Sequence, residues 1–316
     1  MIVATLWTLG GLLLAMLSPR ILTTMICRFV NPTVILATWA AIVVGTFVNL
    51  TVPAVVLLLP NHGGVSAVFH LAQQCWLALH DGASNGVETL VGAVAAIAIT
   101  ALTAGILISW LRMARERRHT HDKHLGIVHI LEGTLQVHDH TLWVPLEQPL
   151  AYSIAGRPSL IVASTGLRSH LRSESVAAVL AHERAHLRGR HHLFVRLAES
   201  VALVLPWLAI MRASPVLVRT LVELAADASA ARTHGRSAVH DALRTLRPHA
   251  VPSPALAMAT DTDCTAVRLH ALATDRNYQP GIRRSFAAYV TAMALPVLPG
   301  VLFLCVMALT SCLAVA

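Results

Sequence analysis

Five consecutive residues, His182 to His186 (HERAH), carry two imidazoles and a carboxylate at a spacing that suits metal-dependent hydrolysis. In a helix, residues four apart lie on one face, so both histidines can reach one metal ion while Glu183 points towards its water. Zinc held by three protein ligands lowers the pKa of that water to about 7 and polarises a peptide carbonyl. The motif therefore predicts His182 and His186 as zinc ligands and Glu183 as general base.

A third ligand is expected from a later helical segment, Glu223 to Asp227 (ELAAD), in an Ala-rich and largely apolar stretch. Glu223 can supply the third ligand oxygen. Asp227 lies one turn away on the same face, where it can accept a hydrogen bond from a ligand imidazole. The two segments together predict one zinc ion per chain.

His192 offers an alternative third ligand, because His182, His186, Gly189 and His192 fit the pattern HExxHxxGxxH. On an unbroken helix His192 would lie about 15 Å along the axis from His182, so this alternative requires a break at Gly189. The apolar run that starts at Leu193 favours a helix that resumes there. Met258 is the candidate for the methionine turn that would accompany this alternative.

The local sequence pattern predicts the secondary structure around the HERAH motif. Residues 141–144 and 151–164 are β-rich, with a turn at residues 156–158, and a helical period of 3.6 begins after Gly166, with Ser173 as a candidate cap. The HERAH segment should therefore lie on a helix that follows a small sheet.

The composition indicates a membrane protein: 55% of the 316 residues are hydrophobic and 13% are charged. Apolar runs of a length that can cross a bilayer cover residues 1–17, 33–59, 89–111 and 286–313. Arg112, Arg115, Arg117, Arg118 and Lys123 follow the third run, whereas residues 61–88 contain no Lys or Arg. By the positive-inside rule, both termini and the 61–88 loop lie outside the cell membrane, and the segment between the third and fourth spans is cytoplasmic.

The expected fold is thus a mainly α, multi-pass membrane protein with about four transmembrane helices and a cytoplasmic α+β metalloprotease domain of gluzincin type. Residues 1–111 form three spans, 112–285 the protease domain and 286–316 the last span. Residues 193–211 are apolar but carry Arg196, Glu199 and Pro206. They are expected to dip into the bilayer or form a buried hairpin rather than cross it.

Other classes fit less well. The net charge of +8 lies beside the apolar runs, where it sets topology, and no nucleic-acid-binding module is present. Five cysteines without a CxxC pair predict no disulfide framework or thiolate site. A signalling or scaffold protein with a structural zinc site remains an alternative. A transporter is disfavoured because the spans carry almost no ionisable residues.

The arrangement resembles the membrane metallopeptidases that include the BlaR and MecR β-lactam-signalling receptors, and more distantly the prenyl-protein proteases. The resemblance is carried by AYSIAGRPSLIVASTGL (151–167), AVLAHERAH (178–186) and ELAAD (223–227), within a frame of three spans before the protease segment and one after it. It implies the zinc ligands His182, His186 and Glu223, with Glu183 as base and Asp227 behind the ligands. It also implies that one strand is an edge that a substrate can join: Ser159, Leu160, Ile161, Val162, Ala163 and Ser164.

The best-known members of this family cleave a transcriptional repressor, so the resemblance implies regulated proteolysis of a BlaI-like repressor in an antibiotic response. The expected partners are this protein substrate and the lipid bilayer, with no direct nucleic acid, and a homodimer stays open. The receptors continue into an extracellular penicillin-binding domain, whereas this chain stops at Ala316. Direct acylation by β-lactams is therefore not expected.

Overall fold

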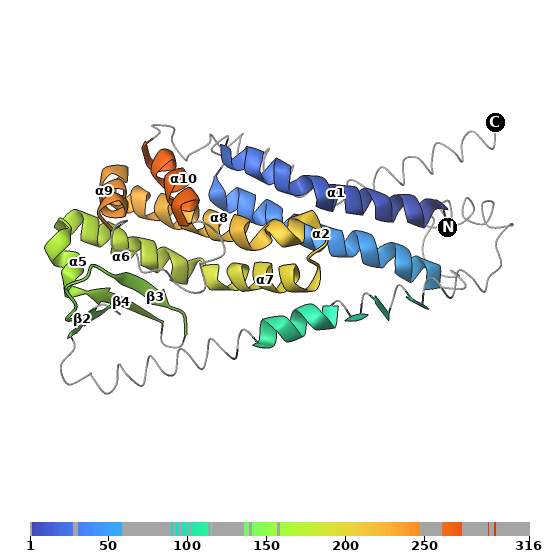
Figure 1. Cartoon of the computed structure of the whole chain (residues 1–316), viewed down its shortest axis with the longest axis horizontal. Helices are drawn as coiled ribbons and strands as arrows, with labels where there is room; N and C mark the ends of the chain where they lie inside the picture. Colours follow the sequence, from blue (N-terminus) through green and yellow to red (C-terminus); the bar gives the residue numbers. More distant parts are fainter. Residues whose placement is uncertain are drawn as a thin grey trace.

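The computed structural model describes residues 2–27, 31–58, 136–138, 141–156, 159–246 and 261–273, with some positions between 90 and 115 and positions 290 and 294. The described chain is mostly helical (Figure 1). Its elements are α1 (Ile2–Cys27), α2 (Pro32–Leu58), β1 (Gln136–His138), β2 (Thr141–Val144), β3 (Ala151–Ile154), β4 (Leu160–Ser164), α5 (Thr165–His170), α6 (Ser173–Arg188), α7 (His191–Val204), α8 (Ala209–His234), α9 (Arg236–Leu246) and α10 (Asp261–Ala273).

Two helices near the N-terminus are long and apolar enough to cross a membrane, over Trp7–Cys27 and Pro32–Thr51. They pack against each other, and the Trp7 indole N–H donates a 2.7 Å hydrogen bond to the Asn49 side chain. Of the third predicted span, at 89–111, the described positions are helical. The predicted fourth span and the 61–88 loop lie essentially outside the described residues, so both stay predictions.

The described strands form one sheet in the order β1-β2-β4-β3. β2 and β4 are parallel, while β1 and β3 are each antiparallel to their neighbour. The strands predicted at 141–144 and within 151–164 are confirmed. The expectation that Ser159 to Ser164 form an edge is wrong, because β4 pairs with β2 on one side and with β3 on the other. All five β4 residues are buried, as an uninterrupted apolar run in a central strand predicts, and β3 is at the edge of the described sheet.

Residues 193–211 form a helical hairpin, in which α7 turns at residues 205–208 into α8. The hairpin shares a core with α1 and α2 that includes Ala15, Trp39 and Leu221. Within this core the Trp39 indole N–H donates a 2.8 Å hydrogen bond to the Ser214 hydroxyl. The hairpin form is as predicted. Its consequence is that α8 is fixed directly on the two apolar helices.

Helix α6 lies between the sheet and α8. One side of α6, with Val176 and Val179, packs on Ala163 and Leu167, and another side packs on α8 and α9 through alanines. The small alanine side chains permit close approach of the helix backbones. The predicted cap is wrong by one residue: Ser173 is the first helical residue, and Arg172 holds the extended N-cap position without a side-chain cap.

The Trp39–Ser214 hydrogen bond makes a testable contribution to stability. Both side chains are completely buried, so a Ser214→Ala substitution leaves the indole N–H without its acceptor. We expect the free energy of unfolding to fall by about 1–3 kcal/mol, measured by denaturant titration in detergent. Thr24→Ala is the control, because its exposed hydroxyl bonds only the backbone of its own helix. An equal effect of both substitutions would contradict the assigned role.

Candidate metal centre

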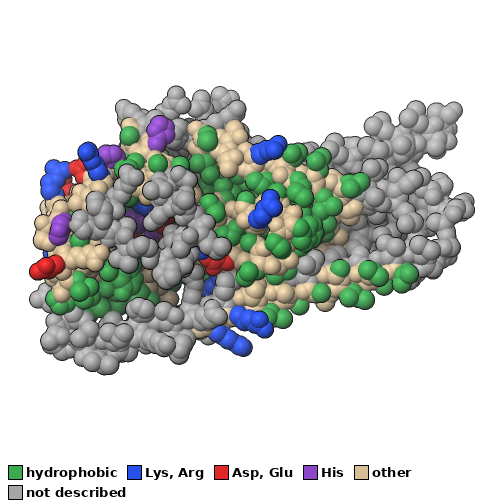
Figure 2. Space-filling model, in the orientation of Figure 1, with side chains coloured by type: hydrophobic (Ala, Val, Ile, Leu, Met, Phe, Trp, Pro, Cys, Tyr) green, Lys and Arg blue, Asp and Glu red, His purple; other side chains and the backbone are tan. Residues whose placement is uncertain are grey.

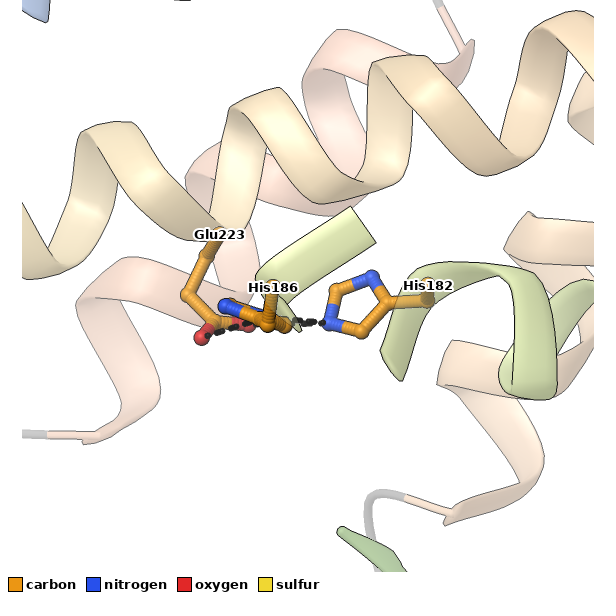
Figure 3. Close-up of side chains that lie close together, drawn as sticks. All are labelled: His182, His186 and Glu223. Atoms are coloured by element: carbon orange, nitrogen blue, oxygen red, sulfur yellow. Dashed lines mark hydrogen bonds and ion pairs between the residues drawn. The ribbon is translucent and has the colours of Figure 1, made fainter. Parts of the chain in front are cut away.

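Three side chains from α6 and α8 converge on one point (Figure 3). The Nε2 atoms of His182 and His186 are 3.0 Å apart, and each is 3.4 Å from a carboxylate oxygen of Glu223. One ligand atom from each residue lies within 4.8 Å of the others. The structure thus brings together the three residues that the two sequence motifs predict.

The donor set and its spacing fit a zinc ion. Two imidazole nitrogens and one carboxylate oxygen are a ligand set of catalytic zinc sites. At zinc–ligand distances of about 2.0–2.1 Å, ligand atoms in a tetrahedral site are about 3.3 Å apart, close to the separations found here. Three protein ligands leave a fourth position for a water molecule or a substrate. The geometry therefore allows a catalytic site and does not require a closed, structural one.

Asp227 fixes the orientation of the His182 ring. Its Oδ1 lies 2.9 Å from His182 Nδ1, on the side of the ring opposite to the three-residue cluster. Burial lowers the pKa of the His182 imidazole, but the hydrogen bonds to Asp227 and Glu223 outweigh this and raise the pKa to about 10. These carboxylates therefore favour positive charge at His182, whether from a proton or from a metal ion.

His186 has a different environment. Burial is the main cause that lowers its pKa to about 4, and the Glu223 carboxylate only partly opposes it. Its imidazole is therefore neutral at physiological pH, which is the form that binds a metal. The two histidines thus have different partners at their outer nitrogens: the Asp227 carboxylate contacts His182, and the His191 imidazole contacts His186.

Glu183 lies beside the cluster on α6 and is partly buried. Burial raises the pKa of its carboxyl group, while the nearby His182 and a hydrogen bond with the Ser153 hydroxyl act in the opposite direction. Ser153 belongs to β3, which packs against α6. The predicted base therefore lies between the metal ligands and the edge strand of the described sheet.

His192 is not brought to the cluster, although the chain does break where that alternative requires it. α6 ends at Arg188, and Arg190 adopts a left-handed conformation with φ 48° before α7 begins. The break turns His191 rather than His192 towards the site, and His191 Nδ1 lies 3.0 Å from His186 Nδ1. A Cβ atom on Gly189 would lie 2.4 Å from His191 Nε2, so this approach requires glycine. Met258 lies outside the described residues.

Arg268 of α10 completes the site and was not predicted from the sequence. Its Nε and one terminal nitrogen donate to the two oxygens of Asp227 at 2.7 and 2.8 Å, and its other terminal nitrogen lies 2.9 Å from Glu223 Oε2. Burial alone would raise the pKa values of both carboxyl groups, but the Arg268 charge is the largest opposing cause and both are lowered. Arg268 therefore keeps the predicted third ligand ionised.

Comparison with known proteins agrees with this geometry. Residues 138–229 match the family model described as Peptidase family M48. The matched segment runs from the end of β1 into α8 and includes His182, His186, Glu223 and Asp227. Comparisons with curated proteins and with solved structures found no match. The match supports a metallopeptidase function for this segment. Members of the matched family are typically zinc-dependent.

The contacts of Arg268 predict its effect on metal binding. We expect Arg268→Gln to weaken zinc binding about 10–100-fold, because Asp227 and Glu223 lose the guanidinium that orients them. Arg268→Lys should have an intermediate effect, since it keeps the charge but not the two-pronged geometry. The measurement is zinc competition with a chelator, with folding checked by circular dichroism.

The chain offers a matched control in Arg172, which pairs with Asp241 at 2.6 Å on the surface. The two side chains are 74% and 44% exposed, so Arg172→Gln should leave zinc affinity unchanged. Equal affinities of the two glutamine variants would show that Arg268 does not support the metal ligands.

Proposed function

We propose that this protein is a membrane-bound zinc endopeptidase. The observation that carries the proposal is the convergence of His182, His186 and Glu223, with Glu183 one residue from a ligand, inside the segment that matches Peptidase family M48. Two apolar helices pack directly on the helix that carries Glu223, which supports a membrane location for the enzyme.

Each residue of the site would have a distinct role. His182, His186 and Glu223 hold the ion, and Asp227 with Arg268 hold His182 and Glu223 in place. A bound zinc ion would supply Lewis acidity, which lowers the pKa of water to about 7 and polarises the peptide carbonyl. Glu183 takes the proton of the attacking water and passes it to the leaving amine. Its raised pKa brings it closer to the operating pH, where proton transfer in both directions is efficient.

The substrate would bind as an extended segment along β3 rather than along β4. Within the described sheet β3 has β4 as its only partner, so its other edge can pair with a polypeptide backbone. The Ser153 contact with Glu183 puts this edge beside the catalytic carboxylate. Backbone pairing there would present the scissile bond to the metal centre with little dependence on side-chain sequence.

A cytoplasmic or membrane-proximal protein is the proposed substrate, and a BlaI-like repressor is the candidate that the sequence motifs suggest. The proposed topology puts the protease domain in the cytoplasm, with the Arg112 to Lys123 cluster on the same side. Signal transduction and a response to antibiotics rest on the motif resemblance alone.

The role of Glu183 can be tested by comparing wild type with Glu183→Gln in cells. We expect a protein fragment with a new terminus in wild-type cells and its loss in the variant, because glutamine cannot accept the proton. Quantitative proteomics of termini measures this and would also identify the substrate. Loss of cleavage should be at least 100-fold, in line with about 10²–10⁴-fold for general acid–base catalysis.

The control is Glu174→Gln, which changes the same residue type in the exposed first turn of α6. This variant should cleave normally, and both variants should retain zinc. Equal cleavage by wild type and Glu183→Gln would remove Glu183 from the mechanism. Bound zinc with no cleavage by wild type would favour the structural-zinc alternative.

A further inference from the structure

The turn between α7 and α8 exposes large apolar side chains. Leu203 is 68% exposed and Trp207 is 56% exposed, whereas their neighbours Leu205 and Leu208 are completely buried against α1 and α2. An exposed tryptophan at the end of a hairpin is unfavourable in water and typical of a membrane–water interface. On the face of the molecule that Figure 2 shows, hydrophobic side chains cover much of the helical part.

The position of this turn along the apolar helices can be derived from contacts. Asn49 of α2 is bonded to Trp7, and a Cβ on Gly11 would lie 2.6 Å from Asn49 Cβ. α1 and α2 run antiparallel and rise by the same distance per residue. Trp39 precedes Asn49 by ten residues, and residue 21 follows Gly11 by ten residues, so Trp39 and residue 21 lie at the same level along the helix axes. Ser214 of α8 is bonded to Trp39 and is therefore at this level too.

Two exposed arginines mark this level. Arg20 of α1 lies one residue from it, and Arg212 of α8 lies two residues, or about 3 Å, from Ser214. From this level to the far end of α1 or α2 there are 18 to 20 residues without a charge, about 27–30 Å of helix. This length equals the hydrocarbon thickness of a bilayer, about 30 Å. Arg20 and Arg212 therefore fall where lipid phosphates would lie.

We propose that the turn between α7 and α8, at residues 203–208, inserts into the lipid leaflet next to the protease domain, with lipid acyl chains as its partner. Arg20 and Arg212 pair with the phosphate groups of that leaflet. The first residue of α8, Ala209, precedes Ser214 by five residues. The turn therefore reaches about 8 Å past the arginine level, towards the middle of the bilayer. Elements that lie in the interface bury their apolar faces by about 5–10 Å.

Insertion of the turn also sets the height of the metal centre. Glu223 lies nine residues from Ser214 in the opposite direction along α8, about 14 Å above the arginine level. An extended polypeptide covers that distance in about four residues. This consequence rests on the proposed function: the enzyme would cleave chains close to where they leave the membrane.

The test uses nitroxide labels introduced as an unnatural amino acid at positions 203 and 207, in the full chain reconstituted in vesicles of phosphatidylcholine and phosphatidylglycerol. Position 146 is the matched control, because Leu146 is an apolar residue of similar exposure, 47%, in the protease segment. Oxygen concentrates in lipid, whereas a neutral nickel chelate stays in water. We expect the labels at 203 and 207 to be relaxed mainly by oxygen, and the label at 146 mainly by the nickel chelate.

Each other outcome overturns the inference. Nickel access at 203 and 207 equal to that at 146 would mean that the turn is in water. Exclusion of both reagents would mean that protein, either a second copy or another part of this chain, covers the turn. The measurement does not depend on cleavage, so a water-exposed turn together with Glu183-dependent proteolysis would reject this inference and leave the proposed function standing.

Discussion

The structure depends on how two carboxylates on one helix, the buried Asp227 and the partly buried Glu223, are neutralised. Glu223 and Asp227 are one turn apart on α8, where like charges repel, and burial adds a desolvation cost to each. Arg268 bonds both of them, and the His182 ring bonds Asp227 and faces Glu223. A divalent cation at the three ligand atoms would add further positive charge at the point where the carboxylates need it. The charges of Glu223 and Asp227 are thus compensated jointly by residues of α6 and α10 and by any bound metal ion, so metal binding depends on how these helices pack on α8.

Helix α8 connects the metal centre to the apolar helices. The same 26-residue helix carries Ser214, which bonds Trp39 in α2, and Glu223 and Asp227 in the metal centre. This helix runs without interruption from Ala209 to His234, although Pro215, beside Ser214, lacks the N–H that would bond to the Met211 carbonyl. A change in the position of α1 or α2 would therefore move Glu223 relative to the histidine pair. α8 is therefore a physical connection between the apolar helices and the candidate metal centre.

Local periodicity was enough to predict the central part of the site. The spacing of His182 and His186, and of Glu223 and Asp227, follows the period of one helix, and both pairs lie on helices in the structure. Strand order could not be predicted in the same way, since it depends on contacts between segments far apart in sequence. That is why Ser159 to Ser164 could be recognised as a strand but not as a central one. The uninterrupted apolar run from Leu160 to Ala163 was the available signal in the sequence, because central strands are apolar on both faces.

Arg268 was missed for a related reason. It is 41 residues from Asp227, on a helix separated from α9 by residues 247–260, and no spacing rule connects the two. The available signal was chemical. A helix that holds two carboxylates one turn apart in a largely apolar stretch requires a cation, and the sequence beyond α8 contains several arginines without an assigned role. Choosing Arg268 among them requires the docking of α10, which only the three-dimensional structure provides.

The break after α6 shows how one sequence pattern can lead to a different geometry. The HExxHxxGxxH pattern assigns Gly189 the role of turning His192 onto the metal. Here Gly189 instead leaves room for His191, whose ring would collide with any Cβ at that position. The left-handed conformation of Arg190 costs about 1–2 kcal/mol. Burial of His191 against the outer nitrogen of His186, and the start of α7 in the direction of α8, are the contacts that offset this cost. His191 therefore contacts the predicted ligand His186, and Glu223 is the candidate for the third ligand position.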